Sequence, residues 1–356
     1  MNILHLHPEL NLTCGITKTI YLISGKLNDE FHHHIITLGG DAIDKFVDSK
    51  IMVTEINLKR NSMISSLKIF FKIYNYCKRN KINIIHSYHR YFDLLAFLIS
   101  KLYSVKTITS VQSKVIGQKL FSYNADMLIA PSNNIMLHLE KYFNINGSKI
   151  VVISNFVDQE ELKIYVGKNE LKSELNIPQN SFVIGFIGRF SVKEKGIDIL
   201  LGACQNLYRN HPNTYLILVG NGEDKIFVEE YLKVHSIPVK VIPPQKQIFD
   251  YYNICNLVVL PSRIEPFGIV VIEAGLMKLP VIGSNVDGIA EIIEDNVDGL
   301  LFEPDNIQDL TDKLKVLISD NNKAIFLANN LFEKVSKFYT ADKIIPKYRD
   351  LYNQKD

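Results

Sequence analysis

Residues 182–207 read FVIGFIGRFSVKEKGIDILLGACQNL, a stretch in which a buried strand, a basic loop and a helix follow one another. The apolar run FVIGFI has the length of a strand covered on both faces, and the apolar spacing after Gly196 is that of a helix. The same alternation returns later, with apolar runs at 214–220, 239–244, 255–262 and 279–284. Alternating strands and helices of this kind predict an α/β protein built on doubly wound parallel sheets.

The first half of the chain repeats this pattern, with apolar runs at 2–7, 33–38, 83–87, 106–111, 126–131 and 149–154. A polar segment at 159–180 interrupts it, and 356 residues are too many for one ordinary core. We therefore expect a Rossmann-like domain over residues 1–160, a second over 178–335, and a helical tail over 336–356 that could pack back on the first domain. Two such domains facing each other across a cleft would bind a ligand at the carboxyl ends of their strands.

Charge and cysteine content exclude several classes of protein. The formal net charge of +2 is too small for a dedicated nucleic-acid binder. The four cysteines lie far apart without a Cys-x-x-Cys motif, which fits a reducing cytoplasm rather than a disulfide framework or a zinc site. No apolar run approaches the ~18 residues of a membrane-spanning helix, and MNILHLHP is no signal peptide. We expect a cytoplasmic protein.

Basic residues gather in the first half, where 18 lysines and arginines accompany 12 acidic residues over residues 1–160. The helical segment at 62–78 has apolar residues three to four positions apart, namely Met63, Leu67, Phe70, Phe71 and Tyr74. Basic side chains surround it: Lys59, Arg60, Lys68, Lys72, Lys78, Arg79 and Lys81. Such a helix suits peripheral docking on an anionic inner-membrane surface. The alternative is a helix packed on the core with a solvated lysine face.

The basic loop at 188–196 is the first candidate for an anion site. Gly188 ends a buried strand, and Arg189 and Lys195 follow it within one loop. The guanidinium group is a planar fork and the ammonium group a point charge, so the two can converge on one phosphate. The alternative is an ordinary strand–loop–helix unit whose basic loop is merely solvated.

A second glycine-rich loop, VGNGE at 219–223, follows another strand and contains Asn221 and Gly222. As a dinucleotide fingerprint it is weak, because the full Gly-x-Gly-x-x-Gly pattern is missing. A tight turn at the rim of a ligand site explains this loop equally well.

The segment PSRIEPFGIVVIEAG, at 261–275, carries two glutamates eight positions apart. Glu265 lies in a loop punctuated by proline and glycine, where it can accept hydrogen bonds from hydroxyls. The helix start at 267–270 offers backbone N–H groups to a phosphate, and Glu273, in an otherwise apolar helix, needs a partner such as a ribose diol. The alternative for each glutamate is a salt bridge or a capping contact. A paired-carboxylate hydrolase is the rival function for these two glutamates, and it would need the two carboxyls to face each other across a bond. Placement of one glutamate in a loop and the other in a helix, beside a helix start, fits binding better.

Residues at strand ends of the first half are further candidates. Gly15, within NLTCGITKTIYLISGKL at 11–27, would let the backbone approach a ligand across the cleft. His86 and His89, within IIHSYHR at 84–90, are either acceptor-site groups or structural histidines. No residues are spaced as metal ligands, and there is no Asp-x-Asp motif. Cationic side chains and helix dipoles would then have to supply the positive charge around a diphosphate.

Four motifs, in this order and spacing, make the chain similar to a known family: GRFSVKEKG at 188–196, VGNGE, PSRIEPFGIVVIEAG, and DGIAEIIEDNVDGLLFEP at 287–304. The chain resembles the retaining GT-B glycosyltransferases of glycosyl transferases group 1 (glycosyltransferase family four) over essentially its whole length. The resemblance implies transfer of a sugar from a nucleotide-diphosphate sugar, with UDP favoured and GDP as the alternative, to a glycan or lipid-linked acceptor. It implies no cofactor and no bound metal, and its usual setting is bacterial surface polysaccharide synthesis.

The resemblance also assigns roles to residues. Arg189 and Lys195 would hold the donor diphosphate, Glu265 would contact hydroxyls of the donor sugar, and Glu273 would bind the ribose. Gly15 matches the loop that closes over the phosphates. Further donor contacts would come from Gly188, Asn221, Gly222, Pro266, Phe267, Gly268, Ile269 and Val270. The reaction would retain the anomeric configuration by front-face attack, and the leaving phosphate would take the acceptor proton.

Departures from the family pattern lie mostly in the first half, where acceptors bind. The glycine pair of the family is Cys14-Gly15 here, and Gln112 stands where the family often has a histidine near the reacting sugar. We therefore take His86, His89 and Gln112 as candidate acceptor-side residues. Two other functions stay open, a nucleotide-sugar epimerase of similar fold and a non-catalytic binding or assembly subunit.

Overall fold

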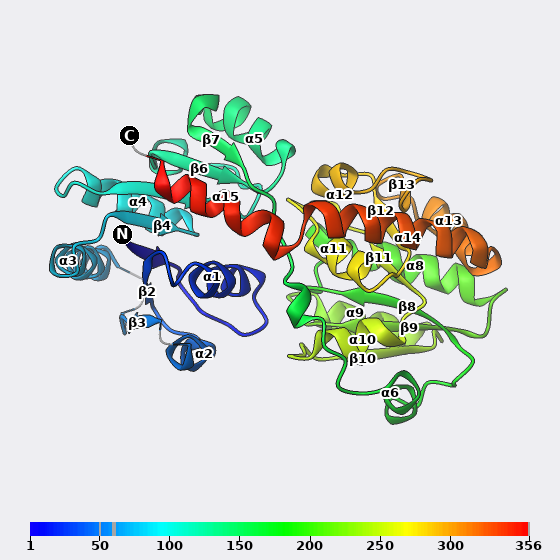
Figure 1. Ribbon diagram of the computed structural model, residues 1–356. Coiled ribbons are helices and arrows are strands. Elements are labelled where there is room, and N and C mark those ends of the chain that lie inside the picture. Colours follow the sequence, from blue (N-terminus) through cyan, green and yellow to red (C-terminus); the bar gives the residue numbers. More distant parts are fainter. Residues whose placement is uncertain (50, 59–61, 355–356) are drawn as a thin grey trace. The chain divides into compact units, whose positions relative to one another are not determined.

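The computed structural model describes residues 1–49, 51–58 and 62–354. It divides into two compact units, Met1–Asn155 with the C-terminal segment from Asp342, and Phe156–Ala341, so the chain passes between the units twice (Figure 1). The predicted break at 160–178 lies inside the second unit, because Leu171 and Ile177 are buried in its core. The predicted tail is divided as well, since residues 336–341 belong to the second unit and the following ones to the first.

The first unit contains a seven-stranded parallel sheet with the order β3-β2-β1-β4-β5-β6-β7. All of its strands except β3 coincide with predicted apolar runs. β3 is absent from the prediction because this edge strand lacks the continuous apolar run of a strand covered on both faces. The strands are β1 (Asn2–Leu6), β2 (His32–Thr37), β3 (Met52–Glu55), β4 (Ile84–Ser87), β5 (Lys106–Ser110), β6 (Met127–Ala130) and β7 (Ile150–Val152).

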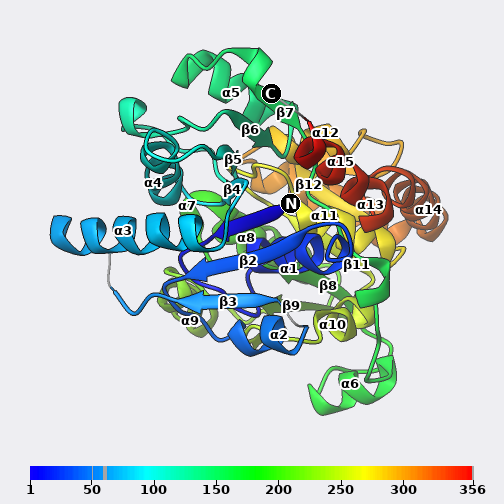
Figure 2. The same ribbon diagram turned by 60° about the vertical axis from the view of Figure 1, so that its left-hand side comes forward.

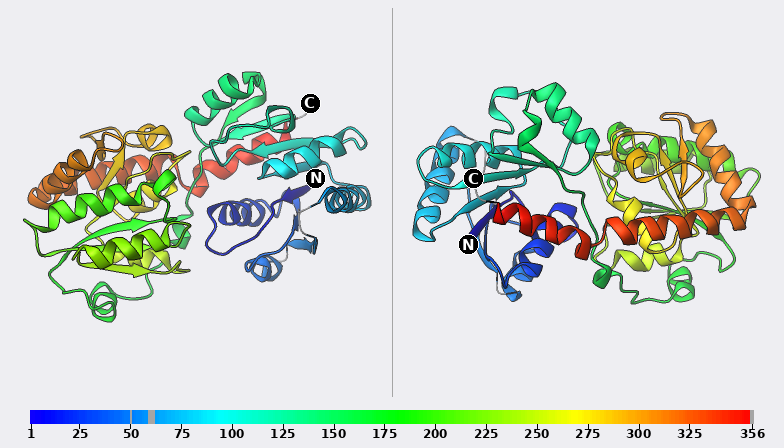
Figure 3. Two further views of the ribbon diagram at one scale, coloured as in Figure 1. Left: turned by 180° about the vertical axis from the view of Figure 1, so that it is seen from behind. Right: turned by 45° about the horizontal axis from the view of Figure 1, so that its top comes forward.

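Helices cover both faces of this sheet. Leu4 and Ile85 pack with α3 and α4, whereas the adjacent His5 and His86 point to the other face, because side chains alternate along a strand. Helix α15 lies along that second face (Figure 3), where its Tyr352 contacts His86. The helices are α1 (Gly15–Lys26), α2 (Ile43–Asp48), α3 (Met63–Arg79), α4 (Arg90–Ser100), α5 (Asn133–Phe143) and α15 (Ala341–Asn353).

The second unit contains a six-stranded parallel sheet with the order β10-β9-β8-β11-β12-β13. Its strands are β8 (Phe182–Ile187), β9 (Thr214–Val219), β10 (Val239–Ile242), β11 (Leu257–Leu260), β12 (Val281–Ser284) and β13 (Leu300–Phe302). The predicted runs account for all of them except β13, an edge strand of three residues.

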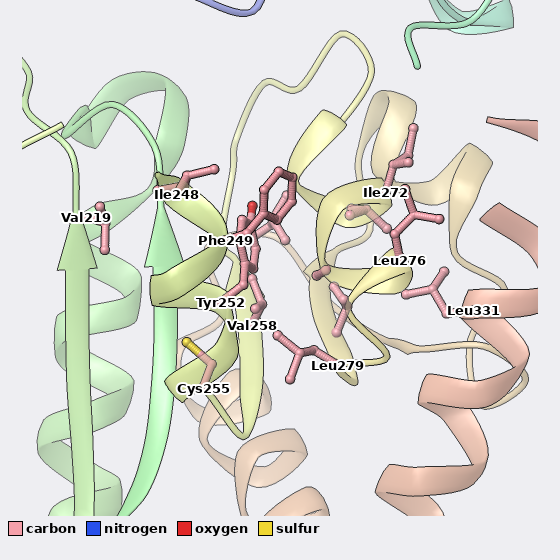
Figure 4. Packing of buried hydrophobic residues seen from close by; sticks show 14 of the residues in the cluster. Val219, Ile248, Phe249, Tyr252, Cys255, Val258, Ile272, Leu276, Leu279 and Leu331 are labelled. Carbon is pink, nitrogen blue, oxygen red and sulfur yellow. The ribbon is translucent and has the colours of Figure 1, made fainter. Parts of the chain in front are cut away.

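Two hydrophobic clusters fill the space between the second sheet and its helices. Val183 faces α10, α11 and α12, and the next residue, Ile184, faces α8, α9 and α13. Helix α14 contributes to both clusters, and Figure 4 shows its Leu331 beside Ile272 and Leu276 of α11. The helices are α6 (Lys168–Glu174), α7 (Val192–Lys195), α8 (Ile197–Tyr208), α9 (Lys225–Val234), α10 (Ile248–Ile254), α11 (Ile269–Leu276), α12 (Asp287–Ile292), α13 (Ile307–Ser319) and α14 (Asn321–Phe338).

In each sheet the strand order reverses beside the first strand. β1 lies between β2 and β4, and β8 lies between β9 and β11. The connections on the two sides of such a point leave toward opposite faces, and the crevice between them is where open parallel sheets bind ligands. We therefore expect the ligand site of the second unit at the loops that follow β8 and β11.

Helix α3 forms as predicted, but its apolar residues divide between a buried and an exposed side. The buried residues are Ile69, Phe70, Ile73 and Cys77, whereas Met63, Leu67 and Phe71 are exposed. Lys59 and Arg60, which were predicted to flank this helix, lie outside the described residues. Within residues 1–49, 51–58 and 62–354, no helix is long and apolar enough to cross a bilayer.

Candidate active site

The second unit brings two sequence motifs together where its strand order reverses. β8 and β11 are neighbours, so the loop that begins at Gly188 meets the loop that begins at Pro261. Backbone N–H groups of Arg263 and Ile264 donate to the carbonyl of Glu194, at 2.8 and 3.1 Å. GRFSVKEKG and PSRIEPFG therefore form one site, although about 70 residues separate them in the chain.

Gly196 makes this close approach possible. Its φ of +62° lies in the left-handed region, and a Cβ atom at this position would collide with the carbonyl oxygen of Pro261. On the other side of α7, the Ser191 hydroxyl accepts a hydrogen bond from the Glu194 N–H and caps the helix start. Lys195 lies between Ser191 and Gly196, and their contacts hold it facing the loop that begins at Pro261.

Lys195 and Glu265 form the centre of the site. The ammonium group lies 2.6 Å from Oε2 of Glu265, and both side chains are mostly buried. The Ser262 hydroxyl donates to the same oxygen at 3.2 Å. Two donors therefore orient the carboxylate, and a charge-assisted pair of this kind is stronger than an exposed one. The alternative anticipated from the sequence, a salt bridge, is present, and it joins two of the predicted site residues.

Arg189 lies at the same edge of the sheet but is far more exposed. Its guanidinium pairs with Glu194 and, at 3.9 Å, with Glu223 of the VGNGE loop. The backbone N–H of Glu223 forms a hydrogen bond with the carboxylate of the same residue and lowers the pKa of Glu223. A hydrogen bond with the Ser191 side chain makes a smaller contribution in the same direction. Exposed pairs contribute little to stability, so an incoming phosphate can replace these carboxylates around Arg189.

The VGNGE loop packs directly on the loop that carries Arg189. A Cβ atom on Gly220 would collide with the carbonyl oxygen of Gly188, so this close approach requires glycine. The Phe190 N–H donates to the carbonyl of Asn221 at 2.9 Å, and Gly222 lies against Phe190. The glycines of this motif therefore serve backbone packing, and they place Asn221 at the exposed rim of the site.

Helix α11 begins beside Glu265. Gly268 is its N-cap and brings no side chain to the first turn, so the N–H groups at Ile269 and Val270 point out of a helix end with a positive dipole. Pro266 and the buried Phe267 connect Glu265 to this helix start. An anion held here would lie close to the Lys195–Glu265 pair.

Glu273 is buried one turn further along α11, and a tyrosine is among its partners. The Tyr252 hydroxyl donates to Oε2 of Glu273 at 2.7 Å. Burial, with the Glu273 carboxylate as a second cause, raises the pKa of Tyr252 well above its usual value, so this hydroxyl stays protonated. Tyr252 lies in the core beside Phe249 and Val258 (Figure 4). It carries no local sequence signal for a role in a site.

Arg263 is a second residue that the sequence motifs did not single out. Its guanidinium binds both carboxylate oxygens of Asp198 at 2.8 Å, Asp305 at 2.6 Å, and the carbonyl of Val192. The hydrogen bond with Asp198 is the main cause that raises the pKa of Arg263. Arg263 thus ties the loop containing Glu265 to the loop containing Lys195.

Gly15 belongs to the first unit and is the exposed first residue of α1. A Cβ atom there would meet nothing within 4 Å, so packing does not require glycine at this position. Its neighbour Cys14 is the N-cap of α1 and makes no side-chain capping bond.

The three predicted acceptor-side residues have different surroundings in the first unit. His86 is fully buried, with its ring nitrogens 2.8 Å from the Tyr352 and Ser110 hydroxyls, so it supports the packing of α15 instead of reaching an acceptor. Burial lowers the pKa of His86 to about 3, with a smaller contribution from His33. His89 accepts from the Tyr91 N–H and caps α4. Gln112 is partly exposed after β5, with Oε1 3.5 Å from Nδ2 of Asn155.

Over residues 1–49, 51–58 and 62–354, no group of three or more histidine, cysteine or acidic side chains is placed to hold a metal ion.

Comparison with known proteins places this geometry in a family. The profile "Glycosyltransferase Family 4" matches residues 14–161, and "Glycosyl transferases group 1" matches residues 167–333. The capsular polysaccharide biosynthesis glycosyltransferase CapM of Staphylococcus aureus is 24% identical over 364 residues, 95% of each chain. The UDP-Gal:alpha-D-GlcNAc-diphosphoundecaprenol alpha-1,3-galactosyltransferase of Escherichia coli is 24% identical over 348 residues, 91% of this chain and 89% of that one.

Solved structures share the fold. Anabaena HepE in complex with UDP-glucose matches with a TM-score of 0.88 at 20% identity, over 99% of each chain. WaaG, a glycosyltransferase involved in lipopolysaccharide biosynthesis, matches with a TM-score of 0.81 at 14% identity, over 99% of this chain and 100% of that one. Two Rossmann-like units of this kind are those of the GT-B fold. The chain belongs to the group 1 glycosyltransferases.

Proposed function

We propose that this glycosyltransferase moves a sugar from a nucleotide-diphosphate sugar to a glycan or lipid-linked acceptor, with retention of configuration and without a metal ion or cofactor. UDP is the favoured nucleotide and GDP the alternative. Anabaena HepE was solved with UDP-glucose, and the E. coli relative is named for a UDP-Gal donor and a diphosphoundecaprenol acceptor, which supports both parts of the proposal. The names of CapM and WaaG support a role in surface polysaccharide synthesis. We propose that this synthesis takes place in the cytoplasm, with peripheral contact of the enzyme at the inner membrane.

The Lys195–Glu265 pair is the observation that carries this proposal. It lies at the strand-order reversal, beside the start of α11, where a diphosphate and its attached sugar can both be reached. In the proposed complex, Lys195, Arg189 and the first-turn N–H groups of α11 bind the diphosphate. Glu265, oriented by Lys195 and Ser262, accepts hydrogen bonds from the sugar hydroxyls. Glu273, oriented by Tyr252, binds the ribose.

In the proposed reaction, the acceptor hydroxyl oxygen bonds to the anomeric carbon on the face from which the diphosphate departs. The bond between that carbon and the phosphate oxygen breaks, and the hydroxyl proton passes to the departing phosphate oxygen, so no side chain is required as the base. Negative charge grows on the phosphate during this step. Lys195 and Arg189 would stabilise that charge more strongly in the transition state than in the bound donor, which is the requirement for catalysis.

Glu265→Gln tests the assignment directly. The amide has the same shape as the carboxylate but lacks its charge, so we expect kcat for transfer to fall on the order of 100-fold while UDP affinity, measured by calorimetry, stays nearly unchanged. Glu229→Gln is the matched control, because Glu229 makes an exposed ion pair with Lys225 on α9 of the same unit. Equal losses of transfer and of UDP affinity would refute the role of Glu265 at the sugar.

Donor and mechanism are tested with the unmodified protein. We expect a UDP-sugar to raise the melting temperature more than GDP-, ADP- or CMP-sugars, and transfer to persist in the presence of a chelator. The product linkage, determined by NMR, should have the anomeric configuration of the donor. Conversion of the donor sugar without any acceptor would favour the epimerase instead, and loss of transfer with chelator that a divalent ion restores would refute the metal-free site.

A further inference from the structure

Helix α3 of the first unit has two apolar faces, and only one of them is buried. Ile69, Phe70, Ile73 and Cys77 pack into the unit. On a second side of the helix the exposed fractions are 80% for Met63, 67% for Ile64, 52% for Leu67 and 56% for Phe71. Leu67 is four positions from both Met63 and Phe71 and three from Ile64, so the four side chains share one side of the helix, and we call them the outer face.

The outer face needs an explanation, because soluble proteins rarely leave several large apolar side chains together in water. Ser62 caps α3, with its hydroxyl accepting from the Ser65 N–H at 3.1 Å, so Met63 and Ile64 belong to a well-formed first turn. Figure 2 shows α3 on the outside of the first unit, along one side of its sheet. The described residues leave all four side chains more than half exposed.

The charges around the outer face indicate what covers it. Lys68 and Lys72 are exposed and lie one turn apart along its flank, and Lys78 and Arg79 follow at the C-terminal end of the helix. From Met63 to Arg79 the helix contains no aspartate or glutamate. An apolar stripe on a helix whose charged residues are all basic is complementary to a surface with an apolar interior and anionic groups at its boundary.

We propose that the outer face of α3 docks on an anionic lipid surface. Met63, Ile64, Leu67 and Phe71 enter the boundary between headgroups and acyl chains, and Lys68 and Lys72 contact lipid phosphates. A second copy of this chain fits less well, because two such helices would bring their lysines together, and lysine is depleted in protein–protein interfaces. The proposal specifies the membrane contact that is part of the proposed function, but it depends on no donor-site residue.

Vesicle co-sedimentation tests this proposal without donor or acceptor, so its failure leaves the transferase assignment untouched. We expect the full chain to bind vesicles of phosphatidylcholine mixed with phosphatidylglycerol, and to bind pure phosphatidylcholine much more weakly. Added salt should weaken binding to the mixed vesicles, because it screens the lysines. Lys68→Gln/Lys72→Gln should lower the partition coefficient roughly 30-fold, since each basic side chain near an anionic surface contributes a factor of about five.

The apolar part is tested by Leu67→Gln/Phe71→Gln, which should lower binding roughly tenfold or more. The matched control is Ile325→Gln/Phe326→Gln on α14, where the two side chains are 51% and 55% exposed. All substituted side chains lie at the surface, and circular dichroism should show an unchanged fold. Three results would each overturn the proposal: no binding of anionic vesicles by the unmodified chain, equal losses in the α3 and α14 variants, or a dimer in sedimentation velocity that Leu67→Gln/Phe71→Gln dissociates.

Discussion

The hydroxyl group of Tyr252 donates a hydrogen bond to the buried carboxylate of Glu273 at 2.7 Å. This hydroxyl is the polar group of the tyrosine side chain. If Glu273 binds the ribose as proposed, its orientation depends on this bond, because a buried carboxylate with fewer donors can turn away from a ligand.

Tyr252→Phe should therefore lower UDP affinity roughly tenfold, the effect of losing about one hydrogen bond to a charged group. It should also reduce the preference for UDP over 2′-deoxy-UDP, and titration calorimetry with both nucleotides measures the two effects together. Tyr231→Phe is the control, since it removes a hydroxyl that donates to Gln205 at 2.6 Å in the same unit. A lower melting temperature with unchanged preference for the ribose hydroxyl would leave Tyr252 with a purely structural role.

At the residue scale, the sequence predicts the residues that lie inside compact motifs. Lys195 and Glu265 could be found because each stands at a fixed place beside a strand end, and the fold then brings them to 2.6 Å. Tyr252 and Asp198 could not, because neither belongs to a recognisable motif and each acts through another side chain, Glu273 or Arg263. For His86 the sequence left an acceptor-site role and a structural role open, because the residue that covers it, Tyr352, comes 266 residues later.

At the element scale, a loop that carries a site residue depends on glycine for its position. Gly196→Ala places a methyl group against the carbonyl of Pro261 at a φ of +62°, so we expect the second unit to lose roughly 2–4 kcal/mol of unfolding free energy. Gly167→Ala is the control, because Gly167 has a φ of −64° and open space around it, and it should change stability by less than about 0.5 kcal/mol. Urea denaturation measures both, and similar small effects would mean that the two loops can separate without cost.

Element types were more predictable than element faces. Buried strands are recognised by continuous apolar runs, so every strand of both sheets was predicted except the short edge strands β3 and β13. In α3 the helical period was correct, yet it could not select the buried side, because the helix is apolar on two sides. Which side is buried follows only from the position of the sheet.

At the scale of the whole molecule, the two ends of the chain depend on each other, because α15 returns from the second unit to cover the first sheet. Tyr352 lies 2.8 Å from His86, Arg349 pairs with Glu30 at 2.7 Å, and Lys106 donates to the carbonyl of Gln354 at 2.8 Å. The sequence predicted a helical tail over residues 336–356 that could pack back on the first domain, but the residue at which the chain leaves the second unit could not be predicted, because it depends on contacts within each core.

The histidines under α15 make this arrangement sensitive to acid. Burial lowers the pKa of His86 to about 3 and that of His33 to about 4, and His5, which contacts His33 at 2.8 Å, is shifted in the same direction. In the unfolded chain these rings have their ordinary pKa of 6.5. Between pH 6.5 and the lowered pKa values of the folded protein, the unfolded state therefore binds more protons than the folded state. Stability therefore falls as the pH falls below 6.5.

Each of these histidines contributes a slope of up to about 1.4 kcal/mol per pH unit to the unfolding free energy of the first unit. We expect hydrogen exchange in β4 and α15 to accelerate together between pH 6.5 and 4, after correction for the intrinsic pH dependence of exchange. His86→Gln removes one titrating ring and should reduce the slope by about one such contribution, whereas His32→Gln, at an exposed position of the same sheet, should leave it unchanged. Equal slopes in the unmodified chain and the His86 variant would show that protonation of His86 does not control the release of α15, and that its contact with Tyr352 contributes packing alone.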